Sequence, residues 1–178
     1  MAKKLKTISE MTQEERKLLN SELCARIPYG VICQGEYQEE ASYRRPYGGW
    51  VKVKGTIEGT DNVNGDFGRE KYFIIEGQSC PDSTVYPYLR PLVGECGMTT
   101  EEFEELRVIC PNILYNCTKD DSWVIKFDDK YSTSPDQVGQ MNRLINFLKT
   151  KQFDYCGLIE SRLAVRVTKK NNPYNNRI

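Results

Sequence analysis

The segment from Tyr86 to Leu92, with the sequence YPYLRPL, constrains the fold more than any other stretch of the chain. Its two prolines lie four residues apart. Each proline fixes φ at about −65° and removes a backbone hydrogen-bond donor. We therefore expect neither a helix nor a central strand to run through the segment, and Tyr86 and Arg90, which precede the prolines, favour extended backbone. The pattern predicts a stiff structural joint formed by Pro87, Tyr88, Arg90 and Pro91.

The size and charge of the chain indicate an ordinary globular protein. It has 178 residues, of which 39% are hydrophobic and 28% charged, so one well-buried core is expected. The formal net charge is zero, which argues against a protein held to nucleic acid by its overall charge. No apolar run approaches the ~18 residues that a membrane span needs, and no secretory signal follows the basic N-terminus. We expect a cytoplasmic protein with no membrane association.

The sequence contains no histidine, which excludes histidine-dependent catalytic triads and every metal site with an imidazole ligand. The seven cysteines show no C-x-x-C pair and no short zinc-binding spacing. We expect them to be reduced thiols that act as small hydrophobic residues. Cys96 precedes a predicted helix start, but Glu95 opposes its thiolate, so no catalytic role is expected.

Capping residues and periodicity predict the helices. Thr12 with Glu15, and Thr99 with Glu102, form capping boxes that open helices ending at Pro28 and Pro111. A third helix is expected from Ser134 to about residue 151 and carries the clearest apolar stripe of the chain: Val138, Met141, Leu144, Ile145 and Leu148. A short last helix is expected to run through Leu163.

Strands are predicted between the first two helices. Residues 31–38, 50–58 and 70–76 are expected to form an antiparallel meander, since 50–58 alternates strictly between apolar and polar residues. The dipeptide Asn64-Gly65 favours a hairpin turn, and 123–127 is expected to form a fourth strand. The fold class is therefore α+β, a single domain over residues 1–168 with a small antiparallel sheet, which could form a partly open barrel, and three to four helices. The sheet-rich part spans about 28–85, the helical part about 98–164, and 169–178 is expected to be a frayed tail. We expect Arg90 to pair with Glu101 or Glu102.

Several motifs occur together along the chain: LCARIPYGV at 23–31, PYLRPL at 87–92, MTTEE at 98–102, FL at 147–148 and FDYCGLIE at 153–160. In this combination the chain resembles a family of short uncharacterised proteins of gut anaerobic bacteria, their prophages and other mobile elements. The resemblance implies a mobile-element association and no particular activity. The chain departs from the family pattern at Cys156, where members of that family tend to have arginine.

The loop from Tyr43 to Trp50 and the strand after it are rich in aromatic and basic side chains that could bind a ligand. Two guanidinium groups lie among aromatic residues, and two lysines follow on the polar face of the strand. These residues could have structural roles, contact a protein, since Arg, Tyr and Trp dominate interface hot spots, or stack bases and hold phosphates. The candidate binding residues are Arg44, Arg45, Tyr47, Trp50, Lys52 and Lys54.

No other pattern supports a catalytic or ligand site. Aligning Gly65 with the glycine of a calcium loop places Lys71 at the position of the bidentate acid, so the segment around it does not fit. The sequence has no phosphate-binding glycine motif, and its adjacent acidic pairs do not converge on one point. We expect no catalytic residue, no metal and no cofactor. The leading hypothesis is a non-enzymatic protein-binding or accessory module, with a nucleic-acid binder as the alternative and an enzyme last.

Overall fold

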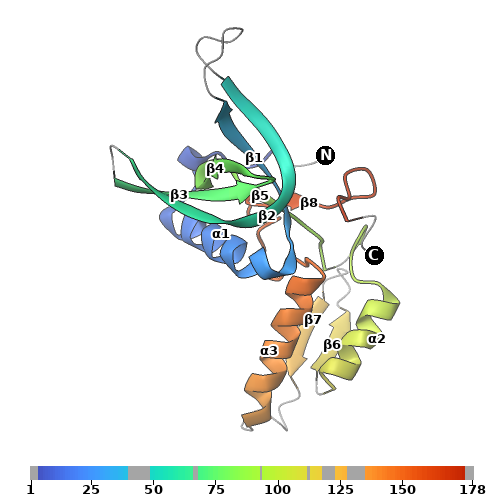
Figure 1. The fold of residues 1–178 in the computed structure, drawn as a ribbon. Coiled ribbons are helices and arrows are strands. Elements are labelled where there is room, and N and C mark those ends of the chain that lie inside the picture. Colours follow the sequence, from blue (N-terminus) through green and yellow to red (C-terminus); the bar gives the residue numbers. More distant parts are fainter. Residues whose placement is uncertain are drawn as a thin grey trace. The chain divides into compact units, whose positions relative to one another are not determined.

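The computed structural model describes residues 4–39, 49–65, 68–92, 94–111, 113–117, 123–127 and 135–174. It has an α+β fold, as the sequence predicts, with an open six-stranded sheet rather than a barrel (Figure 1). The chain divides into two compact units. The first comprises Met1–Tyr88 and Leu158–Val165, and the second Leu89–Gly157 and Arg166–Ile178. In the described part of the chain, no helix is both long and apolar enough to cross a membrane.

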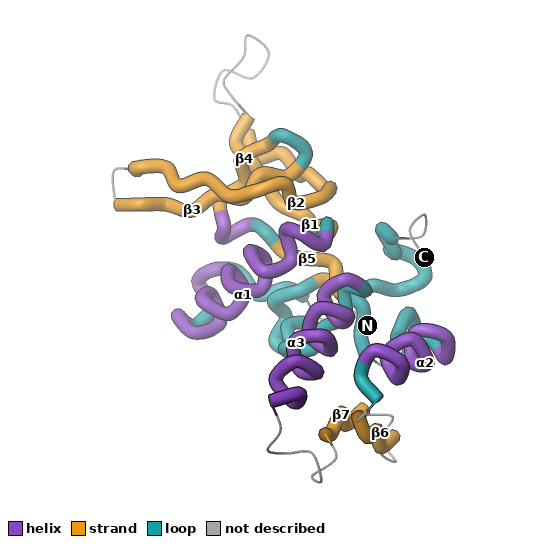
Figure 2. Tube along the Cα trace, turned by 60° about the horizontal axis from the view of Figure 1, so that its bottom comes forward, coloured by secondary structure: helices purple, strands orange, loops and turns teal. Residues whose placement is uncertain are grey.

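The first unit opens with a short 3-10 turn, η1 (Ile8–Glu10), and helix α1 (Gln13–Arg26). The predicted capping box of α1 is confirmed. The Glu15 N–H donates to the Thr12 hydroxyl (3.2 Å), and the Thr12 N–H donates to the Glu15 carboxylate (2.9 Å). A second 3-10 turn, η2 (Ile27–Tyr29), contains Pro28, which ends the α-helix as expected. Helix α1 lies alongside the sheet in Figures 1 and 2 and buries Leu19 and Leu23.

The sheet has the strand order β4-β3-β2-β1-β5-β8. Its strands are β1 (Ile32–Glu39), β2 (Gly49–Gly65), β3 (Gly68–Ile75), β4 (Gln78–Pro81), β5 (Tyr86–Leu89) and β8 (Val165–Arg166). The meander from β1 to β3 is confirmed, but β2 is 17 residues long and extends well past the predicted end at residue 58. Its first half pairs with β1 and its second half with β3, with a register shift between Ile57 and Gly59. One long strand therefore joins two halves of the sheet.

The two halves of the sheet approach closely at Gly35 in β1. A Cβ atom there would lie 3.0 Å from Cys80 Sγ and 3.1 Å from Ile75 Cδ1. Cys33, Phe73, Ile75 and Cys80 are buried in this part of the first unit. Gly35 is therefore needed because any side chain would displace the residues that β3 and β4 bring against β1.

The expectation that no central strand runs through the proline segment is wrong for its first four residues, which form a strand between β1 and β8. Tyr86–Leu89 forms β5, in which Pro87 pairs with Cys33 and Tyr86 with Gln34. Pro87 and the pre-proline Tyr86 favour extended backbone, which is also the backbone of a strand. The ladder with β1 has only two residue pairs, so it requires few backbone donors. A short 3-10 turn, η3 (Asp82–Thr84), connects β4 to β5.

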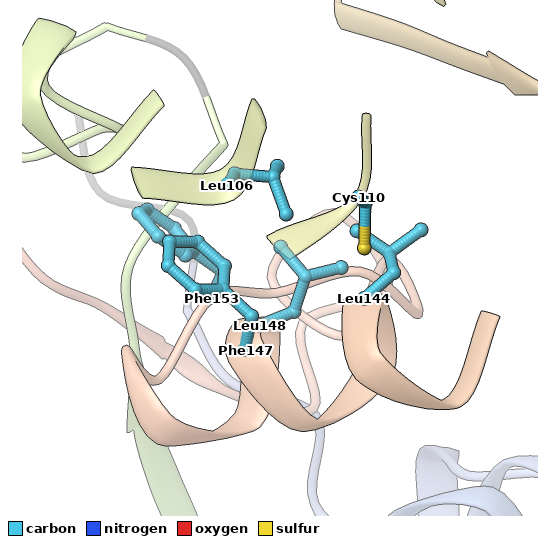
Figure 3. Close-up of a cluster of buried hydrophobic side chains, with 6 residues drawn as sticks. All are labelled: Leu106, Cys110, Leu144, Phe147, Leu148 and Phe153. Carbon is cyan, nitrogen blue, oxygen red and sulfur yellow. The ribbon is translucent and has the colours of Figure 1, made fainter. Parts of the chain in front are cut away.

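The second unit contains helices α2 (Thr100–Ile109) and α3 (Pro135–Thr150) and a hairpin of β6 (Ile113–Cys117) and β7 (Trp123–Phe127). Strand β7 is the predicted fourth strand, and it pairs with β6 in a separate two-stranded sheet. Side chains of α2 and α3 pack with Cys110 and Phe153, which follow these helices, into one apolar cluster (Figure 3): Leu106, Cys110, Leu144, Phe147, Leu148 and Phe153. The apolar stripe predicted for α3 is buried only towards its C-terminal end, since Val138 and Met141 are exposed.

Arg90 is a buried cation of the second unit. Its guanidinium forms two hydrogen bonds with the Glu102 carboxylate, at 2.6 and 2.8 Å, and donates to the carbonyls of Cys96 (3.1 Å) and Gly97 (2.9 Å). It also lies 4.4 Å from the ring centroid of Phe153. Of the two expected partners, Glu102 is therefore the one that pairs with Arg90. The same carboxylate accepts the Thr99 N–H, so it caps α2 as well.

The end of the chain differs from the expectation. The predicted last helix is absent from the described residues, because 158–162 forms turns with a positive φ at Gly157 (73°) and Arg162 (64°). Residues 169–174, expected to fray, form further turns. Asn171 Oδ1 accepts the Thr168 N–H (2.6 Å), and Tyr174 is buried. Residues 175–178 of the predicted tail lie outside the described residues.

Candidate binding groove

One face of the first unit's sheet is polar and aromatic, because the register of three strands brings such side chains together. In β1 and β2, Gln34 pairs with Lys54, Glu36 with Lys52, and Gln38 with Trp50. Directly paired residues lie on the same face of a sheet. Tyr86 pairs with Gln34, so Tyr86 and Tyr88 of β5 share this face too. We call this surface the polar face: Gln34, Glu36, Gln38, Trp50, Lys52, Lys54, Tyr86 and Tyr88.

A groove of about 510 Å³ opens on the polar face. Its floor and walls come from all three strands, with Thr7 and Ile8 of the N-terminal segment and Ser83 and Thr84 of η3 completing the rim. The groove contains six of the eight polar-face side chains: Gln34, Glu36, Lys52, Lys54, Tyr86 and Tyr88. Its volume falls within the usual range for ligand pockets.

Lys54 and Tyr88 form the most defined pair in the groove. The Lys54 ammonium lies 4.5 Å from the centroid of the Tyr88 ring, in a cation–π contact. The Tyr88 hydroxyl donates to Gln34 Oε1 at 3.1 Å, which holds the ring in place. Tyr88 is only 8% exposed, while Lys54 is exposed. Among the described residues, no carboxylate lies within ion-pair distance of Lys54.

The other charged pair of the groove is loose. Lys52 Nζ lies 4.0 Å from Glu36 Oε1, and the Lys52 side chain is 88% exposed. An exposed pair at this distance contributes between 0 and about 1 kcal/mol. Lys52 can therefore exchange Glu36 for a ligand group at little energetic cost. With Lys52, Lys54 and Glu36, the groove carries a net charge of about +1.

The rim of the groove is fixed by hydrogen bonds to neighbouring backbone. The Tyr86 hydroxyl donates to the Lys6 carbonyl (2.6 Å), which ties the N-terminal segment to β5. The Thr84 hydroxyl accepts the Glu36 N–H (3.2 Å) and lies 3.0 Å from the Glu36 carbonyl oxygen. These contacts connect η3 and the N-terminal segment to the strands, so the groove is formed in advance of any ligand.

Burial raises the pKa of the Tyr86 and Tyr88 phenols above the ordinary value of 10.0. Both hydroxyls are therefore protonated at neutral pH and act as hydrogen-bonding groups rather than as bases. Burial also raises the pKa of the Cys80 thiol to about 11 and that of Cys33 still further. The cysteines whose side chains are described are all free thiols, and these two are protonated members of the core.

The candidate binding residues of the sequence fall into two groups. Trp50, Lys52 and Lys54 share the polar face, and Trp50 is 59% exposed, one step beyond the groove along β2. Arg44, Arg45 and Tyr47 lie outside the described residues. The structural-joint residues also separate: Pro87 and Tyr88 belong to β5, and Tyr88 lines the groove, whereas Arg90 and Pro91 are buried in the second unit.

Sequence reasoning missed the contribution of Gln34, Tyr86 and Tyr88 to this site. The sequence pattern predicts Tyr88 only as part of the structural joint, gives Tyr86 no site role, and predicts no central strand in this segment. The period-two spacing of Tyr86 and Tyr88 is a strand pattern, and it is the one signal that could have placed both on the same face.

Two other sequence candidates have structural explanations. Cys96 lies in a turn with φ 60°, and its carbonyl accepts a hydrogen bond from Arg90 Nε. The polar segment from Asp61 onwards continues β2 and pairs with β3. Within the described residues, no group of three or more acidic or cysteine side chains is arranged to hold a metal ion.

Comparison of the chain with known protein families, with curated protein sequences and with solved structures finds no match.

Proposed function

We propose that this chain is a non-enzymatic binding protein whose polar face contacts a protein partner. One observation supports the proposal most strongly. The preformed groove contains Lys54, which pairs with no carboxylate of the described residues, and Trp50, on the same strand, is 59% exposed. Exposed tryptophan beside a polar, partly charged rim is typical of interaction surfaces. The groove supplies shape and charge, and Trp50 supplies an apolar anchor.

The side chains in the groove suit the binding of a partner better than they suit catalysis. The phenols of Tyr86 and Tyr88 are protonated and donate to Lys6 and Gln34, so neither is positioned as a general base. Glu36 is close to Lys52, and its backbone is tied to Thr84. These contacts stabilise the shape of the groove, which supports a binding role.

The nucleic-acid alternative has weaker support on this face. The Tyr88 ring is buried beneath Lys54, so it offers no open surface on which a base could stack. Glu36 would repel the phosphates of a strand running along β1 and β2. Arg44 and Arg45, on which the alternative depends most, would have to supply most of the phosphate contacts.

Affinity capture from the native host tests the proposal, with four forms of the full chain as bait. A partner should be recovered with the wild type and with the control Lys17→Gln. Like Lys54→Gln, the control removes one positive charge from the first unit, but at an exposed position of α1. Recovery should fall at least about fivefold with Lys54→Gln and with Trp50→Ala, because each removes one anchor. Equal recovery of every protein by all four baits would refute a binding role for this face.

We further propose that the protein acts in the cytoplasm in a mobile-element setting, and the resemblance of its motifs to proteins of prophages and other mobile elements is the support for this setting. The gene neighbourhood tests it. Phage or transfer genes beside the gene are expected, and a consistent neighbourhood of housekeeping metabolic genes would contradict it.

A further inference from the structure

We infer that the groove binds an extended peptide segment with one carboxylate side chain, which pairs with Lys54, and one apolar side chain four residues away, which packs on Trp50. This inference rests on the proposed function and specifies the chemistry of the partner. It predicts a sequence pattern: Asp or Glu separated by three residues from an aromatic or large aliphatic residue, in either order along the peptide.

The charges of the groove are the reason to expect one carboxylate side chain on the peptide. Lys54 is fixed over Tyr88, and within the described residues it has no acidic partner. Among the described residues, the one carboxylate within ion-pair distance of Lys52 is that of Glu36, at 4.0 Å. The net charge of about +1 suits a ligand with one negative group, because a second carboxylate near Glu36 would be repelled. A carboxylate that reaches Lys54 would form a charge-assisted hydrogen bond at the mouth of a preformed groove.

The four-residue spacing of the two peptide side chains follows from the separation of Trp50 and Lys54 in β2. Trp50 and Lys54 lie four residues apart on the same face, a separation of about 13 Å at the rise of ~3.3 Å per residue of a strand. A partner that runs along this face in an extended conformation has the same rise. Its side chains return to the same side every second residue, so residues i and i+4 can contact Lys54 and Trp50 together. A helical partner rises only about 6 Å in four residues, so its residues i and i+4 cannot contact both side chains.

Phage display of random dodecapeptides on the immobilised full-length protein tests the inference. Parallel selections use the wild type, Lys54→Gln, Trp50→Ala and the control Lys17→Gln. Lys54 and Trp50 are both exposed, so these variants should fold, and circular dichroism checks this. The best wild-type peptide is then synthesised, and its affinity is compared with that of the same peptide with its acid changed to the amide.

The wild type and Lys17→Gln should enrich peptides with an acid and an apolar residue four positions apart. Lys54→Gln should lose the acidic preference and keep the apolar one, and Trp50→Ala should do the reverse. The amide peptide should bind the wild type about tenfold more weakly, and it should bind Lys54→Gln about as well as the acid peptide does.

Failure of the inference can be distinguished from failure of the proposed function. Peptides that depend on both Lys54 and Trp50 but carry no acid, or carry it at another spacing, overturn the inference and leave the protein-binding role intact. Identical peptide sets from all four proteins overturn both. Salt-sensitive binding of a twenty-residue thymidine oligonucleotide that is lost in Lys54→Gln, with no peptide enrichment, also overturns both and favours the nucleic-acid alternative.

Discussion

The Lys54 ammonium lies 4.5 Å from the centroid of the Tyr88 ring, and Tyr88 donates in turn to Gln34. Three strands thus contribute to one small arrangement, with β5 supplying the ring, β2 the cation and β1 the acceptor that orients the ring. Among the described residues, no carboxylate lies within ion-pair distance of this ammonium, although Glu36 lines the same groove. This arrangement is the basis of the binding role proposed here.

Lys54→Gln should change binding more than stability. The exposed cation–π contact contributes about 0.5–1 kcal/mol, so the free energy of unfolding should fall by no more than about 1 kcal/mol. Urea denaturation of this variant beside Lys17→Gln measures the difference. A loss above about 2 kcal/mol would show that Lys54 is a structural residue and would weaken its assignment as a ligand contact.

Arg90→Ala should destabilise the protein strongly. It leaves the Glu102 carboxylate buried without its cation, and breaking a buried pair in this way costs about 3–5 kcal/mol. The matched control is Arg107→Ala, which breaks the pair with Glu104 on the surface of α2, where both side chains are 58% exposed. That change should cost less than about 1 kcal/mol in the same denaturation experiment. Equal effects of the two substitutions would contradict the stabilising role of the buried Arg90–Glu102 pair.

The Arg90–Glu102 pair should also appear in the pH dependence of stability. Burial acts to raise the pKa of Glu102, but the hydrogen bonds from Arg90 and the Thr99 N–H outweigh it and hold that pKa below the ordinary value of 4.5. The resulting stabilisation is complete above pH 4.5 and disappears as the pH falls through the lowered pKa. Glu10, Glu15 and Glu101 also have lowered pKa values, so wild type is compared with Glu102→Gln. The gap in unfolding free energy between them should be constant near neutral pH and narrow below pH 4.5, whereas a gap independent of pH would contradict the assignment.

Gly35→Ala should destabilise the first unit. The added methyl group would meet Cys80 and Ile75 at 3.0–3.1 Å, and overpacking of this kind costs about 1–3 kcal/mol. Gly59→Ala is the control, because a Cβ atom there meets nothing within 4 Å. Its effect should be within about 0.5 kcal/mol of zero. Thermal unfolding of both variants gives the comparison, and a neutral Gly35→Ala would show that β1 and β4 are packed less closely than described.

Features of the fold that depend on neighbouring residues could be predicted from the sequence. Thr12 with Glu15 and Thr99 with Glu102 predicted the starts of α1 and α2, because a capping box is complete within four residues. Features that depend on distant pairing could not. The second half of β2 has a polar sequence without alternation, and it forms a strand because β3 pairs with it. The predicted last helix fails because backbone with positive φ at Gly157 and Arg162 turns the chain.

In the candidate site, too, the local features could be predicted from the sequence and those that depend on distant pairing could not. Strict alternation after Trp50 placed Lys52 and Lys54 on one face, as the register of β1 and β2 shows. The groove itself depends on Tyr86 and Tyr88 lying beside Gln34, about fifty residues away in the sequence. No local pattern gives that register, since it is set by how the strands pack.

Nuclear magnetic resonance of the ¹⁵N-labelled full chain, titrated with the best peptide from the wild-type selection, tests the binding role most directly. Chemical-shift changes should concentrate on the amides of 34–38, 50–54, Tyr86 and Tyr88, and Lys54→Gln should reduce them at equal peptide concentration. Changes confined to other segments, such as α2 and α3, would contradict the assignment of the polar face as the binding surface.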